Sequence, residues 1–342
     1  MIFLCGVHTI GAQKNDWAWV YKKVFTQMQM NKNGGRKSLI FEKNTIPHFS
    51  QLIFSWNARK PKKGFFTFYV QSRKSDSGGW SKWHKMASWG ADIQKSHYNA
   101  CGVAKYIYVR LETGLKRLGN AFRIKIVAND GASLALLKSF AVCTSNFAKF
   151  KNEFIGTKIK SLKSVHIRHV PKISQRVLNH PHPLFLCSPT SCSMLARFFT
   201  KRTIDPVVFA YSVFDNGGLK AYGSWPFNMA SLFEVCGGKL LCYTARMNSF
   251  TQLHNKLCVG VPVAVSVRGY IKGAPKPYRA GHFLVVTGWD AKRKKVICHD
   301  PAFFSHKGTL VRYDVDSFLR AWERSHRLAY VVEPLGRAYK KV

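Results

Sequence analysis

Apolar and polar residues follow two different periods along the chain. Between about residues 39 and 145, short apolar runs are separated by turn residues, and within 122–126 apolar residues alternate with Arg123 and Lys125. A period of two with one polar face is typical of a sheet that has one side in water. This region is therefore predicted to be an all-β sandwich, with strands at 65–70, 106–111, 122–126 and 139–142.

Beyond residue 164 the apolar residues recur at helical spacing in some segments and form continuous runs in others. The segment 187–199 is predicted to be a helix, with Ser188 as its cap and Pro189 in its first turn. Asp205 and Ser249 are expected to begin two further helices. A fourth helix is predicted at 315–323, and strands at 261–267, 282–289, 295–300, 309–313 and 328–332. This order favours an α+β fold.

Changes in composition suggest the domain boundaries. A chain of 342 residues with 46% hydrophobic content is long enough for two folded domains. We expect an irregular N-terminal segment (1–38, with one amphipathic stretch near 17–28), a β-sandwich domain (39–145), a basic linker (146–163) and an α+β domain (164–342). Four tryptophans lie in the predicted sandwich. Such side chains can form a binding platform but more often fill a core, so we expect core positions for Trp56, Trp80, Trp83 and Trp89.

Cys187 lies at the predicted start of a helix, in the stretch LCSPTS at 186–191. A helix N-terminus leaves backbone N–H groups unpaired and carries partial positive charge, which stabilises a thiolate and lowers the pKa of the thiol. Cys187 is therefore a candidate nucleophile. Cys192 is the alternative, but it lies one turn further along, where the helix field has decayed. The remaining cysteines sit mostly in apolar runs, as buried structural thiols do.

The strands at 282–289 and 295–300 are predicted to form a hairpin around a charged turn. If the chain reverses at residue 291, His282 faces Asp300. Cross-strand neighbours have Cβ atoms about 5 Å apart, close enough for a carboxylate to orient an imidazole ring. Cys187, His282 and Asp300 are thus candidates for nucleophile, base and orienting acid, with Asp290 in the turn as the alternative acid. Gln175 could supply a side-chain donor to an oxyanion.

At five ordered motifs the chain resembles peptidase family thirty-nine of the papain-like clan, whose founding members remove double-glycine leaders from bacteriocins, and its free-standing bacterial relatives. The motifs are HVPKISQ at 169–175, LCSPTS at 186–191, GSWPFN at 223–228, GHFLVV at 281–286 and DPA at 300–302. The resemblance covers roughly 164–335 and implies a papain-like cysteine peptidase domain. It makes Cys187 the nucleophile, His282 the base, Asp300 the orienting acid and Gln175 the oxyanion donor. The implied reaction is cleavage of peptide or amide bonds through a thioester acyl-enzyme.

Some features depart from the leader peptidases. Those proteins usually have glycine after the cysteine and the glutamine about half a dozen residues before it, whereas here Ser188 follows Cys187 and Gln175 lies twelve residues before it. Leader peptidases are also typically fused to a membrane transporter, and this sequence has no run of eighteen apolar residues and no Gly-rich phosphate loop. Leader processing is therefore not the expected activity.

No cofactor or metal is expected. His180, His182, Cys187 and Cys192 lie close together in sequence, but their spacing matches none of the zinc patterns. An odd number of cysteines, nine, without regular spacing does not indicate a disulfide framework. Residues 1–11 are apolar but lack a basic n-region and a full h-region, so they make a poor secretory signal. A cytoplasmic location is slightly favoured.

The sequence carries a large positive charge. Fifty-four Lys and Arg against sixteen Asp and Glu leave a net charge of +38. Such a field attracts polyanions, so an anionic polymer or a membrane surface is an expected partner besides the peptide or protein substrate. The basic residues are scattered and no nucleic-acid-binding motif accompanies them, so specific nucleic-acid recognition is not expected.

Two alternatives to a peptidase stay open. The first is a cell-wall amidase or transpeptidase that uses the same three residues. The second, from a different class, is a catalytically silent binding protein that docks on an anionic envelope polymer or on nucleic acid through its basic surface. The sequence indicates neither the oligomeric state nor the substrate.

Overall fold

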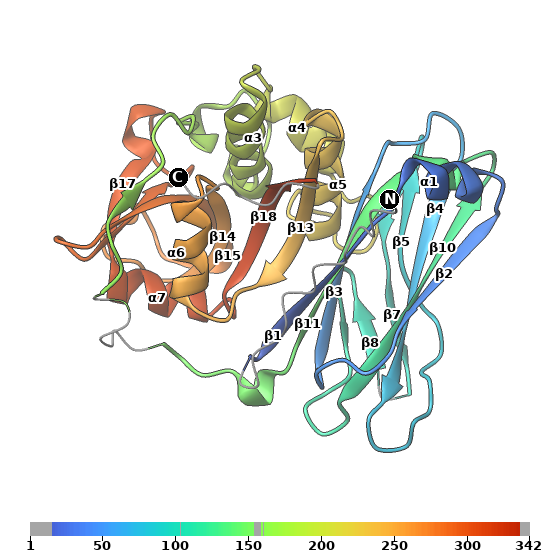
Figure 1. Ribbon diagram of the computed structural model, residues 1–342. Helices are drawn as coiled ribbons and strands as arrows, with labels where there is room; N and C mark the ends of the chain where they lie inside the picture. Colours follow the sequence, from blue (N-terminus) through green and yellow to red (C-terminus); the bar gives the residue numbers. More distant parts are fainter. Residues whose placement is uncertain (1–15, 103, 154–158, 160, 336–342) are drawn as a thin grey trace, which may run out of the picture.

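The computed structural model describes residues 16–102, 104–153, 159 and 161–335 (Figure 1). The first part of the chain forms two antiparallel sheets, with helix α1 (Gln27–Gly34) between β1 and β2. The six strands of one sheet are, in spatial order, β1 (Ala18–Val24), β11 (Leu137–Ser145), β3 (Gln51–Ala58), β9 (Arg110–Glu112), β8 (Ala104–Ile107) and β7 (Tyr98–Cys101). The five strands of the other are β2 (Ser38–Lys43), β10 (Gly119–Asn129), β4 (Phe65–Lys74), β5 (His84–Gly90) and β6 (Gln94–Ser96).

These two sheets pack face to face through aromatic side chains. Trp56 of β3 stacks on Phe68 of β4 with ring centroids 4.1 Å apart and meets Trp89 of β5 edge-on at 5.7 Å. All three side chains are buried, and aromatic residues contribute the most apolar area to such a core. The prediction of an N-terminal β region, with Trp56 and Trp89 in its core, is therefore confirmed.

The other two tryptophans of this region are not core residues. Trp80 and Trp83 are only half-buried. The Arg123 guanidinium lies 4.0 Å from the Trp80 ring centroid, and the Lys125 ammonium lies 4.7 Å from that of Trp83. Both cations come from the polar face of β10, so the two indole rings lie on the outer side of the five-stranded sheet.

Two expectations for the first part of the chain were wrong. Residues 1–38 were expected to be irregular, but within the described residues Ala18–Val24 form β1, which pairs along its whole length with β11. The predicted strand at 106–111 is instead two short strands, β8 and β9. Tyr108 lies between them with a φ of +52°, a left-handed conformation that a strand cannot contain, so the chain reverses and Ile107 pairs with Arg110.

The second part of the chain has a seven-stranded antiparallel sheet. Its strands are, in spatial order, β13 (Leu240–Arg246), β18 (Leu328–Pro334), β14 (Val263–Gly269), β15 (Tyr278–Asp290), β16 (Lys295–His299) and β17 (Leu310–Asp314), with β12 (Val165–His166) paired to β15. The longer helices are α3 (Cys187–Thr200), α4 (Pro206–Val213), α5 (Trp225–Val235), α6 (Phe250–Cys258) and α7 (Val315–Glu323). Helix α3 packs on β14 and β15, and α5 packs on β13. The mixed helix and sheet content agrees with the predicted α+β class.

Local signals explain where two of these helices begin. The Asp205 carboxylate accepts from the N–H groups of Val207 and Val208 and caps α4, and the Ser249 hydroxyl accepts from the Gln252 N–H and caps α6. Helix α5 and strand β13 were not predicted from the sequence. The start of α5 carries a recognisable signal, since its cap residue Ser224 is followed by proline in the first turn. No helix in the described part of the chain is long and apolar enough to cross a bilayer.

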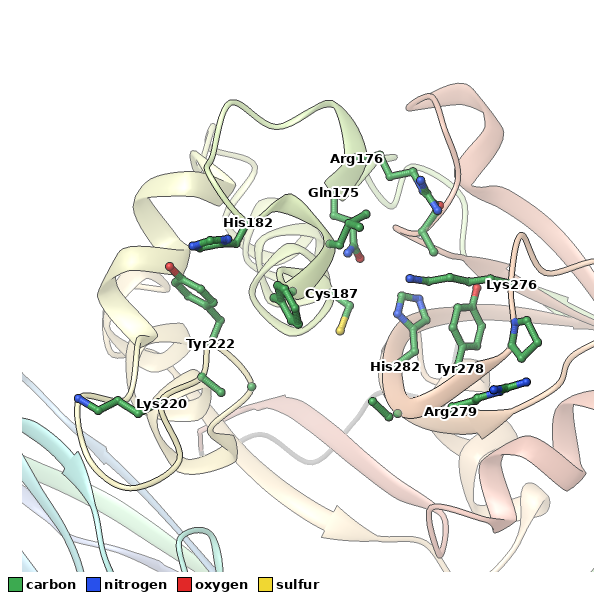
Figure 2. Close-up of a pocket in the computed structure, with 18 of the residues that line it drawn as sticks. Gln175, Arg176, His182, Cys187, Lys220, Tyr222, Lys276, Tyr278, Arg279 and His282 are labelled. Atoms are coloured by element: carbon green, nitrogen blue, oxygen red, sulfur yellow. The ribbon is translucent and has the colours of Figure 1, made fainter.

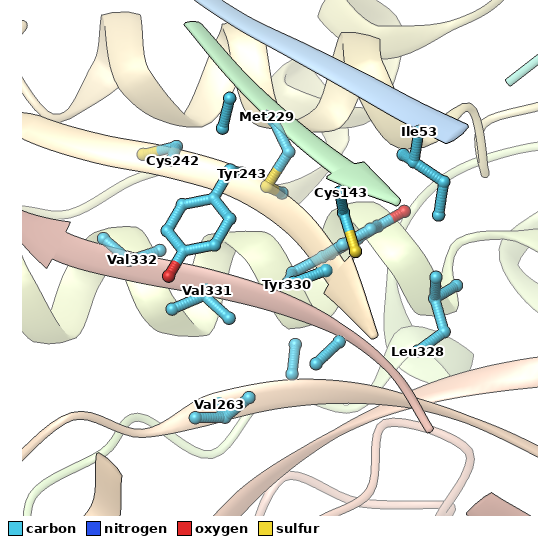
Figure 3. Close-up of a cluster of buried hydrophobic side chains, with 14 of the residues drawn as sticks. Ile53, Cys143, Met229, Cys242, Tyr243, Val263, Leu328, Tyr330, Val331 and Val332 are labelled. Atoms are coloured by element: carbon cyan, nitrogen blue, oxygen red, sulfur yellow. The ribbon is translucent and has the colours of Figure 1, made fainter. Parts of the chain in front are cut away.

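Strand β3 joins the two parts because it is buried on both faces. Its Asn57 amide exchanges two hydrogen bonds with the backbone of Cys242 on β13, at 3.1 and 2.9 Å, and the Ser55 hydroxyl accepts from the Thr244 N–H at 3.0 Å. Figure 3 shows the apolar cluster that surrounds this junction, with side chains from both parts, among them Ile53, Cys143, Met229, Leu328 and Tyr330. The β region and the α+β region therefore share one hydrophobic core.

Arg246, at the end of β13, makes one side-chain hydrogen bond across this junction and two within the α+β region. Its Nε donates to Gln51 Oε1 of β3 at 2.9 Å, and its Nη1 donates to the carbonyls of Ser325 and His326 at 2.8 and 2.9 Å. The side chain is buried, so each bond replaces one to water.

We predict that Arg246→Met lowers the free energy of unfolding by about 3 kcal/mol, because it removes a donor from the buried Gln51 amide oxygen and from the partly buried carbonyls of Ser325 and His326. Differential scanning calorimetry measures this loss. The matched control is Arg293→Met, which removes a guanidinium that is 72% exposed and pairs with Asp290, and should cost less than about 1 kcal/mol. Equal losses in the two variants would show that the buried contact adds no stability of its own.

Candidate active site

Cys187 is the first residue of helix α3. The residue before it, Leu186, is the cap residue and provides no side-chain cap, so the predicted capping role of Ser188 is wrong. Ser188 lies inside the helix, and its backbone N–H instead donates to the Cys187 sulfur, together with the N–H of Phe283. The thiol therefore lies where unpaired helix N–H groups point, as the sequence predicts.

Three hydroxyl contacts fix the start of α3. Ser188 Oγ donates to Asn228 Oδ1 of α5 at 3.0 Å and lies 3.1 Å from the Tyr330 hydroxyl of β18. One turn further, Ser191 Oγ donates to the carbonyl of Phe283 on β15 at 3.2 Å. Because Phe283 directly follows His282, the last bond sets the helix against the strand that carries the histidine.

The predicted register of the β15–β16 hairpin is shifted by two residues. Val285 faces His299 and Val286 faces Cys298, and a bulge follows before Gly288. Continued by one residue, this register places Asp300 opposite Leu284 and diagonal to His282. A shift of two keeps both side chains on the same face of the sheet, whereas a shift of one would separate them. His282 and Asp300 therefore still meet, with Nε2 donating to Oδ1 at 2.7 Å.

Asp300 is fully buried, and its carboxylate accepts four hydrogen bonds. Oδ1 accepts from His282 and from the Ala302 N–H at 2.9 Å, and Oδ2 accepts from the hydroxyls of Tyr278 and Tyr313 at 2.6 Å each. Burial alone would raise the pKa of Asp300, but the charge of His282 and these donors hold it below its ordinary value. The carboxylate thus stays ionised without water.

The two tyrosines were missed in the sequence. Tyr278 lies four residues before His282 on the same strand, which puts both side chains on one face, and this spacing could have identified it. Its ring also stacks on the imidazole with centroids 4.1 Å apart and 16° between planes. Tyr313 lies on β17 and gives no local signal, because its approach to Asp300 depends on the pairing of β16 with β17.

The histidine ring joins the carboxylate to the thiol. Since Nε2 is bound to Asp300, the nitrogen free to meet Cys187 is Nδ1, and the two side chains share a hydrogen bond. Figure 2 shows the Cys187 sulfur and the His282 ring side by side at the floor of a pocket. The described structure thus brings Cys187, His282 and Asp300 into one chain of hydrogen bonds.

The ionisation of the pair follows from these contacts. Burial acts to lower the pKa of His282, but the Asp300 carboxylate outweighs it and raises the pKa to about 9. Burial likewise acts to raise the pKa of Cys187, but the hydrogen bond and charge of His282 and the two backbone N–H groups bring it below its ordinary value. A thiolate next to an imidazolium is therefore favoured near neutral pH.

Gln175 lies close to this group, in the short 3₁₀-helix Gln175–Val177. Its backbone N–H donates to the Pro301 carbonyl at 2.9 Å, next to Asp300. The side-chain Nε2 donates to the Pro183 carbonyl at 3.0 Å, and an amide nitrogen carries a second hydrogen. Gln175 also lines the pocket with Cys187 and His282, so its amide is positioned at the same cavity despite its distance in sequence.

The alternatives considered from the sequence lie elsewhere. Cys192 is fully buried and burial raises its pKa well above the ordinary value. Asp290 lies in the turn, where it accepts from the backbone and guanidinium of Arg293. His180 uses both ring nitrogens, accepting from the His182 N–H and bonding the Tyr222 hydroxyl. Within the described residues, no cluster of His, Cys, Asp or Glu side chains could hold a metal.

The pocket has a volume of about 840 Å³ and runs past the Cys187 sulfur on both sides. Its walls come from the segment before α3, from the loop that ends in Tyr222 and Gly223, and from the hairpin that leads into β15. A cavity of this size accepts a segment of several amino acids, and the thiol is its most reactive group.

Comparison with known proteins agrees with this geometry. Residues 167–330 match the model of the peptidase C39-like family, and residues 41–101 match that of a peptidase C39 N-terminal domain. The region 167–330 thus belongs to a peptidase family. This family is the peptidase C39-like family, so the resemblance to peptidase family thirty-nine is confirmed.

No curated protein sequence matches the chain. A solved structure of a candidate C39-like peptidase from Bacillus anthracis is 17% identical, covering 52% of this chain and 100% of the other, with a TM-score of 0.37.

We predict that Tyr278→Phe lowers the free energy of unfolding by about 2 kcal/mol, because the buried charge loses one of its donors while the stacked ring stays. Calorimetry measures the change. Tyr98→Phe is the control, since Tyr98 is 57% exposed and its substitution should be almost neutral. If the two variants unfold alike, the Tyr278 hydroxyl contributes nothing to the stability of the site.

Proposed function

We propose that the protein is a papain-like cysteine peptidase in which Cys187 is the nucleophile, His282 the base, Asp300 the orienting acid and Gln175 an oxyanion donor. The observation that carries this proposal is the hydrogen-bonded chain from Cys187 through His282 to the buried Asp300, at the floor of a pocket. A helix that presents the thiol and an antiparallel sheet that presents the imidazole support the papain-like class.

The proposed reaction has two stages. The Cys187 thiolate attacks the scissile carbonyl carbon, and a C–S bond forms while negative charge moves to the carbonyl oxygen, toward the second N–H of the Gln175 amide. The His282 imidazolium then gives its Nδ1 proton to the leaving amine, the C–N bond breaks, and a thioester remains. Water, deprotonated by His282, hydrolyses the thioester and restores the thiol pair.

Asp300 acts through His282 in this scheme. The bond to Nε2 fixes the tautomer, so that Nδ1 faces the sulfur, and the negative charge stabilises the imidazolium that forms when Cys187 is ionised. The four hydrogen bonds to Asp300 keep the carboxylate in place during turnover. The family match supports a peptidase, and it leaves the substrate to experiment.

The pair can be tested by iodoacetamide labelling, with the rate read by mass spectrometry at each cysteine. At pH 7 we expect Cys187 to react at least about tenfold faster than Cys258, and His282→Ala to slow Cys187 by about tenfold or more. In that variant only the two backbone N–H groups oppose the effect of burial, so the pKa of Cys187 rises and less thiolate is present at pH 7. A Cys187 rate that does not change in His282→Ala would contradict the proposed pair.

Cys258 is the matched control within the same chain. Its side chain is exposed and its sulfur lies 3.5 Å from His254 Nδ1, yet burial of the sulfur raises the pKa of Cys258. It therefore reports how fast an accessible thiol beside an imidazole reacts without a carboxylate. Equally fast labelling of Cys187 and Cys258 would show that the rate depends only on how accessible each thiol is to the reagent.

We predict a bell-shaped dependence of kcat/KM on pH for a cleaved peptide. Activity rises with pH as Cys187 ionises, below the ordinary range of a thiol, and falls as His282 loses its proton with an apparent pKa of about 9. In Asp300→Asn the group that raises the pKa of His282 is gone, so the alkaline limb should move to lower pH. An alkaline limb that stays in place would assign it to another group.

A further inference from the structure

The pocket around Cys187 is lined by four cationic side chains and by no Asp or Glu. The cations are Arg176, Lys220, Lys276 and Arg279. Figure 2 shows Arg176, Lys276 and Arg279 on the His282 side of the sulfur, whereas Lys220 lies on the opposite side with Tyr222. The positive charge is therefore unevenly distributed along the cavity.

The three cations on the His282 side follow or flank residues of the site. Arg176 follows Gln175, donates Nε to the Ala302 carbonyl at 2.7 Å and lies 4.3 Å from the Phe304 ring centroid. Arg279 and Lys276 flank Tyr278, whose hydroxyl is fixed on the buried Asp300. The same bond that supports the catalytic carboxylate thus also anchors the hairpin that carries two of the charges.

These cations have no internal counter-charge. Across the described residues, no ion pair joins Arg176, Lys276 or Arg279 to a carboxylate, and the nearby Asp300 already accepts four bonds beneath the ring. Lys276 and Arg279 are exposed to solvent. Their charges therefore remain available to a ligand, and a cavity wall of one sign concentrates ligands of the opposite sign.

The opposite side of the cavity carries several apolar side chains. Leu184 and Phe185, just before α3, are 49% and 69% exposed, and the Phe185 ring contacts His182, which lies beside Tyr222 in Figure 2. The Phe214 ring packs on Tyr222 with centroids 4.8 Å apart. Large apolar side chains exposed inside a cavity favour an apolar group of the ligand.

We infer that the cleft selects peptides with acidic residues on one side of the scissile bond and an aromatic or large aliphatic residue on the other. The acidic residues lie against Arg176, Lys276 and Arg279, and the apolar residue lies against Leu184, Phe185 and Tyr222. This inference rests on the proposed function, and it concerns the substrate class rather than the chemistry. It also distinguishes the cleft from the general positive surface, because a uniform charge of +38 would give no such asymmetry.

The first test is cleavage profiling with a proteome-derived peptide mixture. New termini, sequenced by mass spectrometry, should show Asp and Glu enriched on one side of the cut and Phe, Tyr, Leu or Ile on the other. In the double variant Lys276→Glu with Arg279→Glu the acidic preference should be lost. Cut sites that carry Lys and Arg as often as Asp and Glu would overturn the inference.

The control variant carries the same change in net charge elsewhere. Lys62 and Lys116 are exposed on loops of the β region and do not line the cleft. Lys62→Glu with Lys116→Glu should therefore leave the cleavage preference as it is. If this control loses the acidic preference as fully as the cleft variant does, the preference arises from overall charge and the inference fails.

A binding measurement separates this inference from the proposed activity. Cys187→Ala is titrated at physiological salt with two short rhodamine-labelled peptides, one with glutamates after a central Phe-Ala pair and one with glutamates before a central Ala-Phe pair, and with their glutamine counterparts. We expect one of the glutamate peptides to bind about tenfold more tightly than its glutamine counterpart, and the cleft charge reversal to abolish the difference. Equal binding within both pairs would refute the inference even if hydrolysis is observed, and preferential binding without hydrolysis would refute only the proposed activity.

Discussion

Asp300 carries a charge at a point that water does not reach, and much of the second half of the structure is arranged around it. A buried carboxylate is costly unless donors surround it. Here they come from β15, from β17 and from the loop after β16, so these three strands must pair in one register for the charge to be satisfied. The bond to Asp300 also orients the His282 ring, and the bond from Tyr278 anchors the hairpin that carries Lys276 and Arg279. One desolvated group therefore links sheet register, imidazole orientation and the shape of the cleft.

The elements of the fold could be predicted where the signal is local. The cap at Asp205 and the alternation in 122–126 depend on neighbouring residues only, and both were right. Strand β1 could not be predicted, because it is defined by its pairing with β11, more than a hundred residues away. The same holds for β13, which lies against β18 and the outer face of β3. Non-local pairing and the shared core of the two regions leave no periodic mark in the sequence.

The candidate site was predictable to the same extent. The helix start gave Cys187, and hairpin geometry gave His282 and Asp300. The chain reverses later than assumed, with Asp290 facing Lys295, so the register beside the turn differs from the assumed one by three residues, and the bulge before Gly288 reduces the difference to two. The prediction that His282 and Asp300 meet was nevertheless right, because a register shift by an even number of residues keeps both side chains on the same face of the sheet. Gln175 was proposed as a possible side-chain donor, and the resemblance implied its role, but no local signal placed it at the site. Its position beside the site depends on the bond from its backbone to Pro301, which only the folded loop provides.

Comparison of two cysteines explains why a nearby imidazole does not suffice to lower the pKa of a thiol. Cys258 lies 3.5 Å from His254 Nδ1, but the other nitrogen of that ring binds the carbonyl of Lys163, which carries no net charge. His282 instead binds the ionised Asp300, and its pKa rises to about 9. Burial raises the pKa of Cys258 but is outweighed at Cys187. Cys187 also begins a helix and accepts from two backbone N–H groups, whereas Cys258 is the last residue of α6. The contacts that hold Asp300 therefore act on the Cys187 sulfur through the imidazole, and they add to the helix N-terminus in favouring the thiolate.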